Sequence, residues 1–498
     1  MPEAILALDQ GTTGSLALVL ARDGAVLGRA YAPIRQAYPQ PGWVEHDPEE
    51  IWRASLGVMR DALAAARLAP GRLAAIGITN QRETSLVWDR ATGRAVHPAI
   101  VWQSRQTAAI CEGLRGAGYE PMLRRRTGLV LDAYFSGTKL RWLLDRYPEL
   151  PPRAAAGDVL FGTVDTWLLF KLTGGAVHAT EPTNASRTLL FDIHERRWHP
   201  ELLGMLDVPA AMLPAVRPSA GVFGETAALD GLPAGIPVAG FAGDQQAALY
   251  GQGCWAPGMA KNTYGTGCFL VMNTGDRATA SPGGLLTTLA CDERGGACYA
   301  LEGSVFVAGA AIQWLRDELG LIRDAAESEA LARSVPDSLG VYVVPAFTGL
   351  GTPWWDMQAR GAIVGLTRGA GRAHVVRATL ESLAYQTRDV VEVMKADAGI
   401  ALRELRVDGG ASANDFLMQL QADLLGVPVD RPHLVETTAA GAGFLAGLGS
   451  GFWPGPDALR DVRRRERLFE PSMPAAERDR LYSGWRGAVK RVLTLDPG

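Results

Sequence analysis

Three short apolar runs separated by glycine-containing turns open the chain. The runs cover residues 5–8, 15–20 and 25–30, and the turns cover residues 10–14 and 21–24. Short apolar runs broken by such turns are typical of adjacent antiparallel strands. Apolar residues then recur at helical spacing after Asp47-Pro48, which is a favourable helix start. The pattern predicts three strands followed by a helix.

The same order of elements returns in the second half of the chain. Apolar runs at 259–264, 268–273, 285–291 and 298–301 predict a second meander, and a helical pattern follows from about 305 to 319. Both halves place a Gly-Thr pair in the turn between their first two strands. We interpret this as a duplicated α/β domain, residues 1–250 and 251–498, with a ligand cleft between the copies. Two unrelated α/β domains are the alternative.

Composition and charge narrow the class of protein. The chain has 498 residues, of which 47% are hydrophobic and 20% charged, as in a globular enzyme. Its formal net charge of -4 gives no indication of a nucleic-acid partner. Five scattered cysteines without C-x-x-C spacing argue against a disulfide framework or zinc knuckle. No signal peptide or membrane span is evident, so we expect a cytoplasmic protein.

Two turns are candidate phosphate-binding loops. Asp9 ends the first apolar strand and precedes the turn with Thr12, Thr13 and Gly14, and Thr266 lies in the matching turn of the second half. Turn amides and hydroxyls can bind phosphate oxygens, and the carboxylate can bind the Mg²⁺ that accompanies a nucleotide. Ordinary structural hairpins are the alternative for each turn.

Charged residues also follow two other predicted strands. Asp244 comes after the strand at 237–241 and is a candidate general base for phosphoryl transfer, which depends more on positioning than on basicity. A helix cap is its alternative role. Arg82 and Glu83 follow the strand at 73–79, and their hydrogen-bonding groups suit a small polyol packed on an aromatic side chain. A surface ion pair is the alternative.

Two further segments are interpreted from their residues alone. The strand at 406–408, the glycines at 409–410 and the helix start at 412–415 can hold a nucleoside, although a plain strand-to-helix connection explains them equally well. The basic run at 463–467 is expected to be a solvent-exposed helix face, not a nucleic-acid site.

Together the motifs resemble those of the FGGY carbohydrate kinases over about residues 5 to 455. The matching segments are Asp9–Thr13, Asn80–Glu83, Tyr134–Trp142, Gly243–Gln246, Asn262–Phe269, Gly361–Glu381 and Asp408–Gly410. The resemblance implies a duplicated ribonuclease-H-like fold, as in actin-like ATPases. Within the family the match is closest to the kinases that phosphorylate glycerol, with ATP and Mg²⁺, to sn-glycerol 3-phosphate.

The resemblance also implies a role for each matching position. Glycerol would contact Arg82, Glu83, Tyr134, Asp244 and Gln245, with Trp102 and Phe269 as an apolar wall. The nucleotide would contact Thr12, Thr13, Gly14, Thr266, Gly309, Gln313, Gly410 and Asn414. Asp244 would be the base, and Asp9 with Asp244 would surround the metal. A homodimer or homotetramer is expected.

Three positions depart from the family pattern. Leu16 stands where an arginine near the nucleotide is usual, and Arg146 replaces a short polar residue or glutamate. Gly235 stands where the enzymes inhibited by fructose 1,6-bisphosphate have arginine, and its loop lacks a histidine to be phosphorylated. We therefore expect neither form of regulation. Another FGGY kinase for a pentulose or sugar acid, or an actin-like switching ATPase, remains an alternative function.

Overall fold

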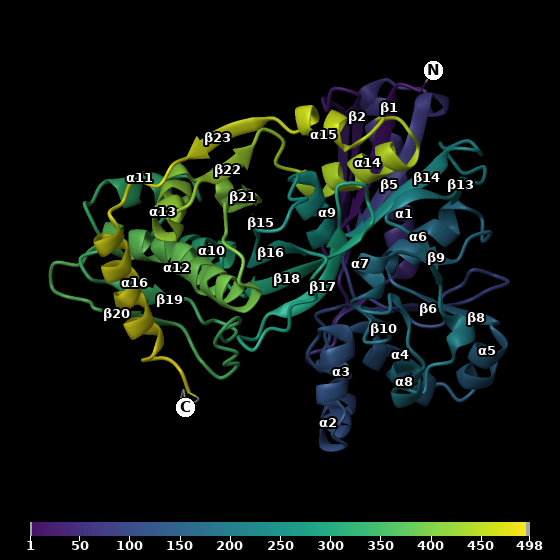
Figure 1. Ribbon diagram of the computed structural model, residues 1–498, viewed down its shortest axis with the longest axis horizontal. Coiled ribbons are helices and arrows are strands. Elements are labelled where there is room, and N and C mark those ends of the chain that lie inside the picture. Colours follow the sequence, from purple (N-terminus) through teal and green to yellow (C-terminus); the bar gives the residue numbers. More distant parts are fainter. Residues whose placement is uncertain (1, 495–498) are drawn as a thin grey trace.

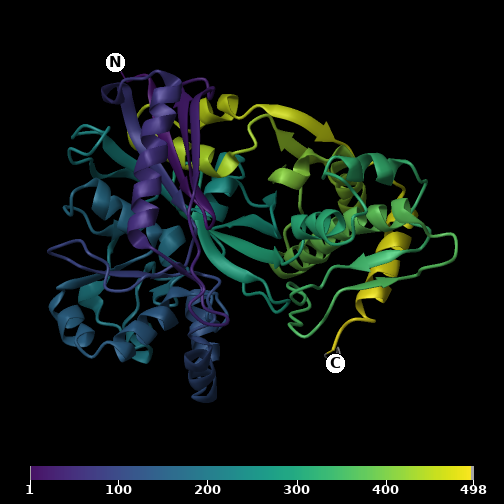
Figure 2. The same cartoon turned by 180° about the vertical axis from the view of Figure 1, so that it is seen from behind.

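The first lobe is built on a six-stranded sheet. The computed structural model describes residues 2–494 and has two lobes (Figures 1 and 2). The sheet has the order β13-β14-β5-β1-β2-β3. Its strands are β1 (Ala4–Gln10), β2 (Gly14–Ala21), β3 (Val26–Pro33), β5 (Leu73–Asn80), β13 (Ala220–Glu225) and β14 (Pro237–Gly243). Strands β1 to β3 form the predicted antiparallel meander. Strands β5 and β14 run parallel to β1, so the carboxyl ends of these three strands meet at one edge.

Helices cover both faces of this sheet. Helix α1 (Pro48–Ala66) starts where predicted, because the Asp47 side chain accepts a hydrogen bond from the Glu49 amide at 2.9 Å. It packs on one face together with α6 (Val164–Leu172). The other face is covered by α14 (Thr437–Gly449), which comes from the far end of the chain. A side chain at Gly77 of β5 would overlap the α14 backbone, so glycine allows this close packing.

The segment between β5 and β13 forms a smaller unit with an apolar core of its own. Its helices are α2 (Ala108–Gly116), α3 (Glu120–Thr127), α4 (Ser136–Arg146), α5 (Leu150–Ala156), α7 (Pro182–Ala185) and α8 (Pro200–Met205). Its short strands, with β4 (Glu45–His46), are β6 (Leu86–Asp89), β7 (Ala99–Ile100), β8 (Val159–Gly162), β9 (Ala179–Thr180), β10 (Phe191–Asp192), β11 (Arg197–Trp198) and β12 (Ala215–Val216). Much of this unit lies below the first sheet in Figure 1.

The second lobe repeats the design around a seven-stranded sheet of order β17-β18-β16-β15-β21-β22-β23. Its strands are β15 (Met259–Tyr264), β16 (Cys268–Gly275), β17 (Leu286–Cys291), β18 (Ala297–Val305), β21 (Glu404–Asp408), β22 (Val429–Pro432) and β23 (Arg465–Phe469). A hairpin of β19 (Tyr342–Val344) and β20 (Ala362–Val364) lies apart from the sheet. The helices are α9 (Asp244–Gly251), between the sheets, and α10 (Gly309–Asp317), α11 (Glu327–Arg333), α12 (Arg372–Ala398), α13 (Asp415–Leu425), α15 (Pro456–Val462) and α16 (Ala475–Val489).

The two sheets share one topology. In each, three antiparallel strands are followed by two parallel strands: β3-β2-β1-β5-β14 in the first lobe and β18-β16-β15-β21-β22 in the second. The duplicated α/β fold predicted from the sequence is therefore confirmed. All five cysteines are free and buried. Within residues 2–494, no helix combines the length and apolarity needed to cross a bilayer.

Three expectations about individual elements are wrong. The strand beside β16 is β18 and not β17, because the β17–β18 hairpin folds back and leaves β17 at the sheet edge. Helix α10 begins at Gly309 and not near 305, since β18 continues to Val305. The basic run at 463–467 is not a helix face: it follows α15 and enters β23 at Arg465. Arg463 and Arg465 bind the buried Asp430.

Candidate functional site

The carboxyl ends of β1, β5 and β14 bring two carboxylates and an arginine together. Asp9 lies near the end of β1, Arg82 follows β5, and Asp244 is the first residue of α9, directly after β14. Arg82 Nε lies 3.1 Å from Asp244 Oδ1. Asp244 also accepts a hydrogen bond from the Gln245 amide, but its side chain remains 29% exposed. The N-cap of α9 is Gly243 and no side chain caps this helix, so Asp244 is not a helix cap and remains accessible to a substrate hydroxyl.

Asp9 is electrostatically coupled to Asp244. Burial raises the pKa of Asp9 to about 7, and the nearby charge of Asp244 adds to this shift. Two carboxylates that repel each other at a partly open edge are an oxygen donor set suited to a hard divalent cation. The structure thus brings together the two residues predicted to surround a metal.

Four charged side chains form a buried group between the lobes, here called the lobe-bridging cluster: Arg82, Glu83 and Arg187 from the first lobe and Glu302 of β18 from the second. Arg82 donates from Nη1 and Nη2 to the two Glu302 oxygens at 2.5 and 3.0 Å. Arg187 donates to Glu83 Oε1 at 2.6 Å and to Glu302 Oε1 at 3.1 Å. These side chains are at most 3% exposed, so a surface ion pair is excluded for Arg82 and Glu83.

The two carboxyl groups of the lobe-bridging cluster differ electrostatically. Burial by itself would raise the pKa of Glu302, but Arg187 and Arg82 together lower it to about 2. For Glu83, burial outweighs the same two arginines and its pKa is raised. Among the described residues, no hydrogen bond uses Glu83 Oε2. That oxygen is therefore free to accept a hydrogen bond from a ligand hydroxyl.

The backbone of Glu83 is held in an unusual conformation. Its φ of 61° lies in the left-handed region, which side-chain-bearing residues rarely adopt. Its carbonyl oxygen accepts hydrogen bonds from Ser136 Oγ at 3.0 Å and Lys139 Nζ at 3.2 Å. Lys139 also donates to the Tyr134 carbonyl, and burial lowers its pKa to about 7. The Tyr134–Trp142 motif thus fixes the backbone beside the lobe-bridging cluster.

Two aromatic rings border this edge. Trp102 and Tyr134 pack edge to face with ring centroids 5.5 Å apart. The Arg187 guanidinium lies 5.6 Å from the Tyr134 ring centroid. Trp102 Nε1 donates to Thr12 Oγ1 at 2.8 Å, which ties the aromatic wall to the first phosphate-loop candidate.

The other predicted substrate residues, Gln245 and Phe269, lie toward the second lobe. Lys261 of β15 donates a hydrogen bond to Gln245 Oε1. Phe269 lies two residues from the β16 position that pairs with both Lys261 and Glu302. Since side chains two residues apart share a face of the sheet, Phe269 is on the face that carries Lys261 and Glu302.

The predicted nucleotide residues fall into two groups. Thr12, Thr13 and Gly14 form the β1–β2 turn of the first lobe, closed by the Gly11 amide to the Gly14 carbonyl at 2.9 Å. The other group lines a cavity of about 500 Å³ in the second lobe. Its predicted members are Thr266, Gly309, Gln313, Gly410 and Asn414. The cavity does not include the first turn.

Local geometry explains the shape of this cavity. The Gly309 amide donates to the Gly265 carbonyl at 3.0 Å, and a Cβ at Gly309 would lie only 2.6 Å from that oxygen. Asn414 caps α13 by accepting from the Leu417 amide at 3.0 Å. Helix α13 therefore begins at Asp415, after a short 3₁₀ turn at Gly410–Ala413.

Two of the departures from the family pattern have a structural account. Leu16 of β2 packs against the apolar core between the first sheet and α14, so it offers the nucleotide no cation. Arg146 is exposed, and its guanidinium lies over the rings of Trp142 and Tyr147. Arg146 is thus a surface difference, as expected.

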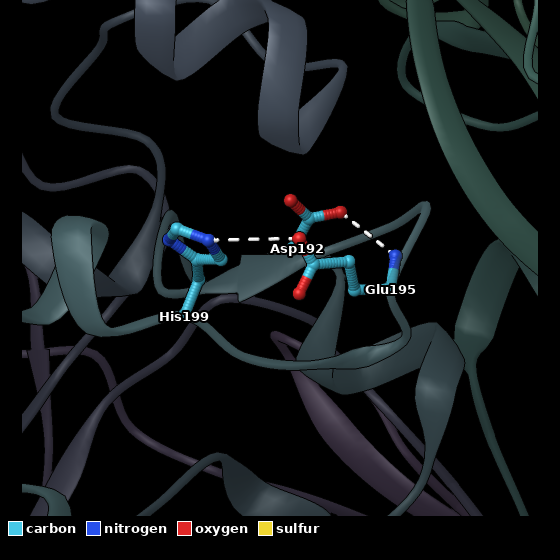
Figure 3. A group of neighbouring side chains, drawn as sticks. All are labelled: Asp192, Glu195 and His199. Atoms are coloured by element: carbon cyan, nitrogen blue, oxygen red, sulfur yellow. Dashed lines mark hydrogen bonds and ion pairs between the residues drawn. The ribbon is translucent and has the colours of Figure 1, made fainter.

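A second group of potential metal ligands has a different explanation. Asp192, Glu195 and His199 face one another near β10 (Figure 3). Arg126 already binds this group, at 3.0 Å from Asp192 and 3.5 Å from Glu195. His199 also caps α8 by accepting from the Glu201 amide. We interpret the group as an ion-pair network.

Arg187, Glu302 and Lys261 were not identified from the sequence. Glu302 and Lys261 each interrupt an apolar strand, and a lone charge in a buried strand is a signal for a polar partner. Arg187 lies in a polar turn and carries no comparable signal.

Comparisons with known protein families identify the family of this chain. The N-terminal domain of the FGGY family of carbohydrate kinases matches residues 4–251, and the C-terminal domain of that family matches residues 260–450. The chain therefore belongs to the FGGY family of carbohydrate kinases.

Comparisons with individual proteins show which members of the family this chain is similar to. The chain is 60% identical to glycerol kinase of Symbiobacterium thermophilum and 58% identical to glycerol kinase 2 of Thermotoga maritima, each over 98% of both chains. The crystal structure of Plasmodium falciparum glycerol kinase with ADP has a TM-score of 0.93 at 34% identity, covering 99% of each chain. Gluconate kinase from Lactobacillus acidophilus, at 21% identity, shares the fold.

Proposed function

We propose that this protein transfers the γ-phosphoryl group of ATP to glycerol, giving sn-glycerol 3-phosphate and ADP. The similarity to glycerol kinases, at 55–60% identity over nearly the whole chain, supports the reaction. The observation that carries it is the accessible Asp244 carboxylate beside the lobe-bridging cluster and the Trp102–Tyr134 wall. This combination suits a small polyol with an apolar carbon side.

Glycerol is proposed to bind across the edge between the lobes. Glu83 Oε2 accepts a hydrogen bond from one hydroxyl, and the remaining free N–H of Arg82 donates to another. Tyr134, Gln245 and Phe269 complete the site, with Trp102 against the carbon chain. The terminal hydroxyl then points at Asp244.

Asp244 acts as the base for that hydroxyl. It accepts the proton while the hydroxyl oxygen attacks the γ-phosphorus in line and the ADP oxygen leaves. Because Arg82 Nε holds the Asp244 carboxylate, the acceptor oxygen is positioned before transfer.

The nucleotide is proposed to lie between the two groups of candidate residues. The cavity of the second lobe holds the nucleoside through Gly309, Gln313, Gly410 and Asn414. Thr266 and the turn with Thr12, Thr13 and Gly14 bind the phosphates from opposite lobes.

Asp9 and Asp244 are proposed to hold Mg²⁺, because their coupled carboxylates form an oxygen donor set. When bound, the cation neutralises charge that develops on the phosphates.

We also propose a cytoplasmic homodimer or homotetramer. The five unpaired cysteines suit a reducing compartment. Analytical ultracentrifugation of the purified protein tests the assembly.

A coupled ADP-release assay tests the activity. The acceptors are glycerol, dihydroxyacetone, xylulose, ribulose and gluconate, with a control lacking acceptor. We expect the highest kcat/KM with glycerol. A higher value for a pentulose or gluconate identifies a different FGGY kinase, and acceptor-independent release identifies a switching ATPase.

A further inference from the structure

A second cavity lies between the lobes, away from the residues assigned to glycerol and nucleotide. Its volume is about 550 Å³. The first lobe contributes the end of α3 and the β10–β11 turn, and the second contributes the loop at 276–285 between β16 and β17. The walls are held together by Arg124 donating to the Ser281 carbonyl at 2.7 Å and by the Thr287 amide donating to the Gly128 carbonyl at 3.0 Å.

Positive charge is concentrated in the lining of this cavity. Arg124 and Arg125 line it, and none of its lining residues is an aspartate or glutamate. Arg125 forms no ion pair among residues 2–494, and Arg124 binds only a neutral carbonyl. The next residue, Arg126, is in contrast paired with three acidic side chains. Arg124 and Arg125 are both exposed and have no counter-charge, so an anion in the cavity meets two uncompensated positive charges.

Carboxylates close to the cavity are already occupied by other donors. Asp397 accepts hydrogen bonds from Ser281 Oγ and from the Gly283 amide. Asp192 accepts from the His194 amide at 2.8 Å and pairs with Arg126. Neither carboxylate pairs with Arg124 or Arg125 in the structure. These two arginines therefore remain available to a ligand.

The lining also offers an apolar surface, whereas its hydroxyl groups are buried or already donate within the protein. Thr279 is 8% exposed, and its buried Oγ1 has no hydrogen-bond partner within the described chain. Ser281 and Thr287 line the same cavity, but their hydroxyls already donate to Asp397 and to the Thr279 carbonyl. Ile193 and Leu285 supply apolar surface. The site thus combines two cations with an area that can cover carbon atoms.

We propose that this cavity binds a small phosphate ester. The forked guanidinium group matches phosphate oxygens in pairs, and two such groups on one rim favour phosphate over a singly charged carboxylate. The apolar surface contacts the carbon part of the ester. Because both lobes form the walls, the bound ester spans the junction between them. This site is separate from the proposed phosphoryl-transfer site.

Isothermal titration with phenyl phosphate, and with inorganic phosphate for comparison, tests the proposal. Saturating ADP, Mg²⁺ and glycerol are present throughout to fill the proposed catalytic site. We expect one saturable site that binds phenyl phosphate more tightly than inorganic phosphate. Replacing Arg124→Gln and Arg125→Gln together should weaken binding about tenfold or more, since each removes a charge-assisted hydrogen bond.

Two further variants separate ligand binding from helix stability. Arginines in the last turn also stabilise a helix end, so Arg124→Lys with Arg125→Lys keeps that charge and should restore part of the binding. Arg294→Gln with Arg368→Gln removes two exposed arginines elsewhere and should leave binding unchanged. Glycerol phosphorylation without added ester should match wild type in all three.

Absence of saturable binding to wild type overturns the proposal. Equal binding by wild type and the double glutamine variant also overturns it, because the ester then binds elsewhere.

Discussion

Replacing Asp244 tests its proposed role as the general base. Asp244→Asn keeps the shape and the hydrogen bond from the Gln245 amide but cannot accept a proton. We expect kcat to fall about 100 to 10,000-fold, the usual contribution of a general base. Nucleotide affinity, measured by fluorescence titration with ADP, should stay near wild type. Retention of more than about a tenth of wild-type turnover would contradict the assignment.

Replacing Glu302 tests how much the lobe-bridging cluster contributes to stability. Glu302→Gln leaves Arg82 and Arg187 without their shared counter-charge, and loss of one partner from a buried ion pair costs about 3–5 kcal/mol of unfolding free energy. The folded pKa of about 2 lies below the ordinary value of 4.5, so the charge stabilises at pH above 4.5 and this stabilisation is lost as pH falls toward 2. Urea unfolding of the wild type and of Glu302→Gln should be measured at pH 7, 4 and 3. The difference in unfolding free energy between them should narrow only below pH 4.5.

Glu293→Gln is the matched control for that series. Glu293 pairs with Arg460 at 3.3 Å but both side chains are well exposed, so the change should cost less than about 1 kcal/mol. A Glu302→Gln variant no less stable than this control would show that the lobe-bridging cluster contributes little.

At the residue scale, positions that follow strands were predictable and their partners were not. Asp9, Arg82 and Asp244 follow apolar runs, and parallel strands bring their carboxyl ends together. The pairing of Arg82 with Glu302 joins residues 220 positions apart. Nothing in local pattern specifies such a contact, because it depends on how the two lobes dock.

At the scale of elements, the start of α10 allows a geometric test of the proposed nucleotide site. A methyl group at Gly309 would press on the Gly265 carbonyl and displace one wall of the second-lobe cavity. Such strain costs about 1–3 kcal/mol. Gly309→Ala should therefore raise the KM for ATP about tenfold and leave the KM for glycerol nearly unchanged. Gly113→Ala, where an added Cβ meets nothing, is the control. Equal changes in both KM values would place Gly309 outside the nucleotide site.

The residues of the loop at 229–237 are the reason why we expect no inhibition by fructose 1,6-bisphosphate. Gly235 has φ near 90°, and Asp230 binds Arg60 of α1. Arg60 is thus already paired with an acidic side chain of the loop. We expect no inhibition by fructose 1,6-bisphosphate at millimolar concentration in steady-state assays. Saturable inhibition would show that the sugar phosphate finds its cations elsewhere.

At the scale of elements, starts and turns were predicted better than strand order. Asp47-Pro48 marks the start of α1 through its own cap. The position of β17 at the sheet edge depends on the tertiary fold of a hairpin, which apolar runs alone do not encode. Arg465 and Arg467 lie in β23 because partners on β22 and α13 neutralise them.

At the scale of the whole molecule, the two groups of predicted nucleotide-binding residues lie in different lobes. Thr12 to Gly14 lie in the first lobe and the 500 Å³ cavity in the second. Phosphoryl transfer also requires exclusion of water, so we expect the lobes to close when both substrates bind. Small-angle X-ray scattering should show a smaller radius of gyration with glycerol plus a non-hydrolysable ATP analogue than with either alone. An unchanged radius would contradict closure.

The duplicated architecture was visible in the sequence because each copy repeats a Gly-Thr turn between its first two strands. The crossing of α14 onto the first sheet was not, since its almost uniformly apolar helix fits the face of either sheet.

That crossing has a consequence for how the protein is made. While a ribosome extends the chain, β1, β5 and β14 emerge long before residues 437–449, which later cover their apolar face. Until then Ile5, Ala7 and Ala239 have no covering helix. A nascent or truncated chain ending near residue 251 therefore presents a bare sheet face, a surface that chaperones bind and that promotes aggregation. The first lobe can mature only when synthesis is almost complete.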